Sequence, residues 1–195
     1  MPGKFKSRFL YSKSARLLLG IGLIVLSLVL LFMILTRGGY DNSERVSAGG
    51  NYVVPVSVNF PAPDLELENL NGKVETLKDF HGQVVLVNNW ATWCPPCKAE
   101  MPTLSDYYND HADEGFAVIA IESGDPREKV LDYVEEYDLP FTVWLDAHAQ
   151  AMQAFQNQNL PSSYVIDRSG IVRFAWTGEI NRELLEKYVT PMLSE

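Results

Sequence analysis

The fold is decided by residues 84–97, which read VVLVNNWATWCPPC. The apolar run at the start of this stretch is typical of a strand buried on both faces of a parallel sheet, and a helix is expected from Pro95 onward. Cys94 then lies at the helix N-terminus, where free backbone N–H groups and the helix dipole stabilise an anion. Because the thiolate is the attacking form, we expect Cys94 to attack a disulfide and Cys97 to resolve the mixed disulfide.

Two other interpretations of the cysteine pair are weaker. A structural zinc site needs about four ligands, whereas the chain has two cysteines in all, and its three histidines are scattered singly along the sequence. A purely structural disulfide between residues three positions apart closes a very small loop and constrains the unfolded chain little. The pair therefore predicts redox chemistry, in which Cys94 and Cys97 alternate between dithiol and disulfide without a metal or a cofactor.

The N-terminal segment predicts a membrane anchor. Residues 1–16 carry five basic side chains and no acidic one, and residues 17–36 are uncharged and mostly apolar, which is the length of one transmembrane helix. A cleaved signal peptide has a shorter apolar region followed at once by a small-residue cleavage site, so we expect this anchor to be retained. Since positive flanks stay cytoplasmic, residues 1–16 form a cytoplasmic tail and the chain after about Arg37 lies outside.

Residues 37–60 are expected to form a flexible tether, because glycine, serine and asparagine are frequent in them. The folded domain is then residues 61–195. Residues 1–37 hold six of the 16 basic residues and none of the 25 acidic ones, which leaves 10 basic against 25 acidic residues and a formal charge of −15 in the remainder. An acidic domain is a poor ligand for nucleic acid, so no nucleic-acid partner is expected.

Beyond residue 61 strands and helices alternate. The alternating residues 64–68 and the pair Asn71-Gly72 predict an N-terminal β-hairpin. Further strands are expected at 84–90, 116–121, 141–145, 163–167 and 171–176. Helices are expected at 95–110, 149–155 and 181–193, and another is expected to begin at Asp125 as N-cap, with Pro126 first in the helix and Glu128 completing a capping box. This order indicates an α/β sandwich.

Residues 84–102 resemble the active-site signature of the membrane-anchored, thioredoxin-like thiol–disulfide oxidoreductases of the TlpA/ResA type, and a looser similarity extends over residues 61–193. The resemblance implies a thioredoxin fold with an N-terminal β-hairpin and a helix–strand unit inserted at about residues 125–146, preceded by one transmembrane helix. It also implies that the Leu160-Pro161 bond is cis. Pro161 is then expected to open the strand that faces the cysteines, and the Leu160 side is expected to be free to pair with an extended substrate strand.

Four further residues bear on the expected site. Trp93 adjoins the nucleophile and is expected to contact clients, whereas Trp90 is assigned to the core. Thioredoxins carry a buried acid at the position of Asn88, and asparagine cannot titrate. Glu100, one helical turn after Cys97 on nearly the same face, matches a glutamate that ResA-type proteins carry near the thiols. The alternative interpretation of Glu100 is a solvated helix residue.

These features predict a membrane-tethered disulfide reductase on the periplasmic or extracellular face of the cell membrane. Two prolines between the cysteines remove N–H groups that would stabilise the Cys94 thiolate, which favours the disulfide and hence a reductant. The resemblance adds apocytochrome c as a client. Because the outside space is oxidising and the chain has no second cysteine pair, a separate membrane thiol electron donor is implied.

Three other functions could be served by a chain of this kind. A general oxidant or isomerase of secreted proteins would use the same residues, and this alternative stays open. A non-enzymatic copper carrier of the Sco type is less favoured, since such proteins use CxxxC and a downstream histidine. A peroxiredoxin is disfavoured because Ala91 stands where its signature has a threonine.

Overall fold

The computed structural model describes residues 54–194, together with Leu23 and Ser27, which are both helical. The predicted cytoplasmic tail and most of the predicted anchor and tether lie outside these residues. Within residues 23, 27 and 54–194, no helix combines the length and the apolar character needed to cross a bilayer.

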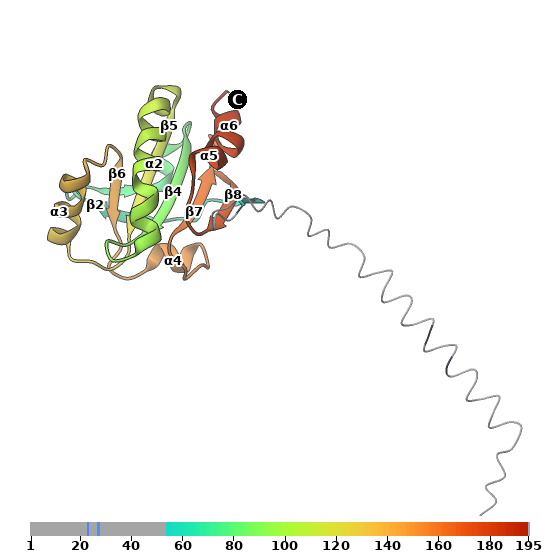
Figure 1. Ribbon diagram of the computed structural model, residues 1–195, viewed down its shortest axis with the longest axis horizontal. Helices are drawn as coiled ribbons and strands as arrows, with labels where there is room; N and C mark the ends of the chain where they lie inside the picture. Colours follow the sequence, from blue (N-terminus) through green and yellow to red (C-terminus); the bar gives the residue numbers. More distant parts are fainter. Residues whose placement is uncertain (1–22, 24–26, 28–53, 195) are drawn as a thin grey trace, which may run out of the picture. The chain divides into compact units, whose positions relative to one another are not determined.

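Eight strands of the described part form one mixed sheet in the order β1-β8-β7-β4-β5-β6-β2-β3 (Figure 1). The strands are β1 Val56–Pro61, β2 Glu66–Asn69, β3 Val74–Thr76, β4 Val84–Trp90, β5 Phe116–Glu122, β6 Thr142–Leu145, β7 Ser162–Ile166 and β8 Ile171–Thr177. β4 is parallel to β5 and antiparallel to β7. Every residue of β4 and β5 is buried, which confirms the two central strands predicted from their apolar runs.

Helices lie against this sheet, and α2 crosses in front of β4 and β5 in Figure 1. The helices are α2 Pro95–His111, α3 Arg127–Tyr137, α4 Gln150–Ala154, α5 Arg182–Tyr188 and α6 Thr190–Leu193, with short 3-10 turns η1 Leu77–Phe80 and η2 Ala112–Glu114. Alternate residues of β4 enter different cores. Leu86 and Trp90 pack with residues of α2 in one core, called the α2 core below. Val85 and Val87 pack in the second core with residues of η1 and α4. The two cores therefore make a sandwich, as predicted.

The predicted hairpin and the predicted insertion are both present, and they contact each other. β2 and β3 are antiparallel, and Gly72 in their turn has a φ of 79°, a conformation that favours glycine. The inserted unit is α3 followed by β6, which lies parallel to β5. β6 in turn pairs with β2, so the insertion joins the hairpin to the central sheet.

The folded part begins earlier than expected. β1 starts at Val56, inside the segment 37–60 that was expected to be a tether, and pairs antiparallel with β8. Its alternate residues Val56, Val58 and Phe60 give it a strand pattern, although only Val58 packs against the core. A strand that gains most of its hydrogen bonds from a distant partner carries a weak local signal.

The C-terminal helix expected at 181–193 is two helices. Asn181 caps α5 by accepting a hydrogen bond from the Leu184 N–H at 2.9 Å, and α5 ends at Tyr188. Pro191 lies in the first turn of α6, and its lack of an N–H removes the bond that would continue α5. The predicted single helix is therefore wrong at this point.

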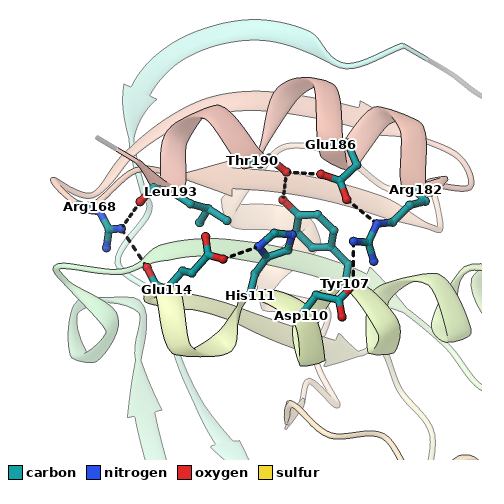
Figure 2. Close-up of polar contacts among 9 residues, drawn as sticks. All are labelled: Tyr107, Asp110, His111, Glu114, Arg168, Arg182, Glu186, Thr190 and Leu193. Atoms are coloured by element: carbon teal, nitrogen blue, oxygen red, sulfur yellow. Dashed lines mark hydrogen bonds and ion pairs between the residues drawn. The ribbon is translucent and has the colours of Figure 1, made fainter.

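A polar cluster attaches the carboxyl half of α2 to α5 and α6 (Figure 2). Tyr107 is buried, and its hydroxyl lies 2.9 Å from Thr190 Oγ1. Thr190 donates to Glu186, and Arg182 bridges Glu186 and Asp110. Because these contacts join one end of α2 to the C-terminal helices, they support the position of the cysteines at its other end.

Candidate active site

The two cysteines lie where β4 leads into α2. Cys94 is the N-cap of α2 with an extended backbone, and Cys97 lies in the first turn. Their sulfurs form a disulfide, with 5.3 Å between the two Cα atoms. Cys97 is fully buried, whereas Cys94 retains 4% of its surface exposed. Cys94 is therefore the more accessible of the two, in keeping with the predicted order of attack.

The two tryptophans near the cysteines lie as predicted. Trp93, immediately before Cys94, has 62% of its surface exposed. Trp90 is fully buried in the α2 core, where its ring packs 5.0 Å from the ring of Tyr133. The exposed indole is an apolar surface beside the disulfide, and its contact with client proteins stays a prediction.

The Leu160-Pro161 peptide bond is cis, as the resemblance implied. β7 begins at the next residue, Ser162, which pairs with Asn89 in β4. Because the two strands are antiparallel, Pro161 lies toward the carboxyl end of β4, from which the CxxC turn emerges. Leu160 is partly buried and packs against the α2 core. The role of Leu160 and Pro161 in binding substrate stays a prediction.

Glu100 is fully buried, so its interpretation as a solvated helix residue is wrong. Oε1 accepts a hydrogen bond from Asn88 Nδ2 at 2.8 Å, and Oε2 accepts one from the Ile180 N–H at 3.0 Å. Asn88 also donates to Ser163 Oγ at 3.0 Å. Burial raises the pKa of Glu100 to about 8, against the opposing effect of the two hydrogen bonds. Glu100 can therefore hold or release a proton near neutral pH.

A second buried carboxyl, Glu122, was missed by the sequence analysis. It ends β5, pairs in register with Trp90, and is fully buried. Its Oε2 accepts the Asp125 N–H at 3.0 Å. Burial, reinforced by the Asp125 carboxylate, raises the pKa of Glu122 to about 8. A carboxylate at the carboxyl end of an otherwise apolar parallel strand was the available signal, since functional groups gather at such edges.

Asp125 does not cap α3 as expected. The N-cap is Pro126, without a side-chain cap bond, and the helix begins at Arg127. The Asp125 carboxylate instead accepts hydrogen bonds from the N–H and hydroxyl of Thr92, and from Lys129 Nζ at 2.7 Å. The predicted capping box is therefore wrong. The Lys129 ammonium and the distant Thr92 hydroxyl bind the Asp125 carboxylate in place of helix N–H groups.

The arrangement can perform thiol–disulfide exchange. In the reduced protein, the Cys94 thiolate attacks a client disulfide and displaces one client sulfur as a thiolate. Cys97 then attacks the Cys94 sulfur, which re-forms the Cys94–Cys97 disulfide and releases the second client thiol, so two electrons pass to the client. Among residues 23, 27 and 54–194 no cluster of three His, Cys, Asp or Glu side chains could hold a metal ion. The fold and the cysteine pair together define a thioredoxin-like thiol–disulfide oxidoreductase.

Comparisons with known proteins agree with this class. The model of the AhpC/TSA family matches residues 58–175. Thiol-disulfide oxidoreductase ResA of Geobacillus kaustophilus is 33% identical over 134 residues, which cover 69% of this chain and 77% of that protein. ResA of Bacillus subtilis is 28% identical over 177 residues, covering 91% and 93%. The crystal structure of a Chlorobium tepidum protein described as thiol:disulfide interchange protein DsbE superposes with a TM-score of 0.65 at 28% identity, covering 69% and 96%.

The chain therefore belongs to the AhpC/TSA family, and its relatives identify it as a thiol–disulfide oxidoreductase of the ResA type.

Proposed function

We propose that this protein is a reductant of disulfides in client proteins outside the cytoplasm, that residues 17–36 tether it to the membrane, and that apocytochrome c is among its clients. The haem-attachment cysteines of an apocytochrome must be thiols before haem is bound, so such a client needs a local source of electrons in an oxidising space. Electrons would reach Cys94 and Cys97 from a membrane thiol donor.

The observation that carries the reducing direction is the pair of prolines at the start of α2. Pro95 and Pro96 occupy the first two helical positions and supply no N–H to the sulfur of Cys94. The Lys98 N–H is bound to the Cys94 carbonyl at 3.1 Å. A thiolate with few donors is weakly stabilised, so the dithiol gives up its electrons readily and the disulfide is the favoured state.

The reduction potential of the full-length protein tests the direction. Equilibration with glutathione buffers should give a value below about −220 mV, as for reductants, whereas a value near −120 mV would indicate an oxidant. Pro96→Ala is the matched comparison, because it adds a backbone N–H and no titratable group. It restores one N–H beside the sulfur and should raise the potential, because that N–H stabilises the thiolate and so the reduced state.

Trapping tests the client. In Cys97→Ser the mixed disulfide on Cys94 forms but cannot be resolved, so the client remains attached and can be identified on a non-reducing gel. Apocytochromes among the attached chains support the proposal. A diverse set of secreted proteins without apocytochromes would replace it by a general reductase or isomerase. Cys94→Ser is the control and should trap little, because Cys97 is fully buried.

A further inference from the structure

Glu122 lies on the same face of the sheet as the redox helix. Side chains alternate along β5, so Phe116, Val118 and Ala120 enter the α2 core, while the residues between them enter the second core. Glu122 continues the first series. In register it neighbours Trp90, and the chain from Trp90 runs directly into the turn that carries Cys94. Glu122 is therefore the carboxyl that ends the strand beside the turn.

Hydrogen bonds connect Glu122 to that turn. Its Oε2 accepts the Asp125 N–H, and the Asp125 carboxylate accepts both the N–H and the hydroxyl of Thr92. Thr92 is two residues before Cys94, and the Cys94 N–H donates to the Ala91 carbonyl at 3.1 Å. The turn Ala91–Cys94 is thus attached to the end of β5 through the Asp125 carboxylate.

The surroundings of Glu122 favour its neutral form. Glu122 Oε1 is buried without a hydrogen-bond donor among the described residues, an arrangement that is costly for an anion and tolerable for a neutral acid. The side chains of Glu122 and Asp125 lie within hydrogen-bonding reach, so a proton on Glu122 can be donated to the Asp125 carboxylate. With that proton gone, both neighbouring carboxylates are charged, and Glu122 is fully buried.

We propose that Glu122 is a positioning residue of the redox site: as a neutral carboxylic acid it holds Asp125 against Thr92, and on ionising it releases the turn that carries Cys94. Since the proposal concerns the dithiol site itself, it holds whichever client is reduced. It adds to the site a control by alkaline pH, in which the turn is fixed when Glu122 is protonated and loosened when it is not.

Other charged and titratable groups surround this position. Burial raises the pKa of Asp125, but hydrogen bonds from Lys129, Thr92 and Glu122 outweigh it and lower that pKa, so Asp125 is the anion of the pair. On α3, Lys129 binds Asp125, and the buried Tyr133 packs on Trp90. On the β6 side, the Asp146 N–H donates to the Glu122 carbonyl at 2.8 Å.

Glu100, on α2, titrates in the same range as Glu122 and must be distinguished from it. Two backbone amides report on the two carboxyl groups separately. The Thr92 N–H donates to Asp125, whereas the Ile180 N–H donates to Glu100. In the NMR spectrum of oxidised full-length protein in detergent, the chemical shifts of both amides should change with pH. The cysteines do not titrate in this state because they form a disulfide. In Glu122→Gln the Thr92 amide should become independent of pH, while the Ile180 amide should titrate as before.

A functional measurement accompanies the spectrum. The rate at which the reduced protein cleaves an aromatic disulfide should show a transition at alkaline pH, caused by ionisation of Glu122. Glu122→Gln should remove that transition. Thr92→Val, which deletes the hydroxyl, should remove it too, and Thr92→Ser, which keeps the hydroxyl, should retain it. Glu128→Gln, an exposed change on α3, is the charge control and should leave both measurements unchanged.

The proposal is overturned if the Thr92 amide titrates alike in the parent and in Glu122→Gln, or if that variant lowers the exchange rate by the same factor at every pH, as a purely structural residue would. Failure of the reductase proposal would give a different result. The reduction potential or the trapped clients would then differ from those expected of a reductase, while the two amides and the cleavage of the aromatic disulfide would still report on Glu122.

Discussion

The Asn88 amide and the Glu100 carboxyl meet across the interface of β4 and α2, with 2.8 Å between Nδ2 and Oε1. Asparagine cannot titrate, so Glu100 on α2 is the titratable member of this pair. Glu100 is thus fixed between β4 and the Ile180 backbone, one turn after Cys97.

Glu100→Gln is expected to slow thiol–disulfide exchange by about tenfold or more, because it removes a proton-transfer group worth up to several powers of ten. Glutamine keeps one acceptor oxygen but turns its NH2 group toward the other N–H donor, so the unpaired buried donors should cost about 1–3 kcal/mol of stability. Stopped-flow exchange rates across pH measure the effect. Glu183→Gln, an exposed change on α5, serves as control, and a rate profile identical to the parent's would assign Glu100 a structural role.

Stability should fall as pH rises from mildly acidic to mildly alkaline. The pKa values of Glu100 and Glu122 are raised from 4.5 to about 8, first of all by burial. Between these two values the folded protein keeps protons that the unfolded chain releases, so each group lowers the unfolding free energy by at most about 1.4 kcal/mol per pH unit. The contribution is complete below 4.5 and lost by about 8.

Urea unfolding of the oxidised protein at several pH values measures this slope. The double variant Glu100→Gln with Glu122→Gln should flatten it. At low pH a different group acts: hydrogen bonds outweigh burial and lower the pKa of Asp167 to about 2, so its contribution disappears as pH falls through that value. A parent protein whose stability rises between about pH 5 and pH 8 would contradict the assignment of neutral buried glutamates.

The two tryptophans should separate client contact from packing. Trp93→Ala should change the unfolding free energy by less than about 0.5 kcal/mol, because the side chain is exposed, and should raise KM for a protein client. Trp90→Ala should cost about 3–5 kcal/mol, since it empties a buried site. Denaturation and client kinetics on both variants test this, and an unchanged KM in Trp93→Ala would remove Trp93 from the client surface.

Placement can be tested with a reporter that is active only outside the cytoplasm, fused after Glu195. The basic residues before the apolar run 17–36 predict an active reporter and a protein that stays in the membrane fraction. Activity of a cytoplasmic reporter at the same position, or release of a shortened soluble form, would show that the anchor or its orientation is wrong.

The sequence predicted those features that depend on local pattern. The apolar run 84–90 and the cysteine pair located β4 and the start of α2, and Asn71-Gly72 located the hairpin turn. The cis bond before Pro161 was expected from the resemblance alone, because most bonds of this kind are trans.

Features that depend on distant partners escaped prediction. Asp125 has the sequence context of a helix cap, yet its carboxylate binds Thr92, 33 residues earlier in the chain. Glu122 ends an apolar strand in the sequence, but its complete burial and its hydrogen bond with the Asp125 N–H depend on tertiary structure. Tertiary contacts override local preference in both cases.

Pairing between β1 and β8 has a consequence for how the chain folds. The first and last strands of the described part lie side by side, with Val56 opposite Ala175. A chain made from its N-terminus therefore carries β1 without a partner until β8 has been synthesised, and such non-local pairing slows folding and leaves a strand edge open in the meantime. A chain ending before Ile171 would keep the cysteines but leave β1 unpaired, exposed to association with other chains.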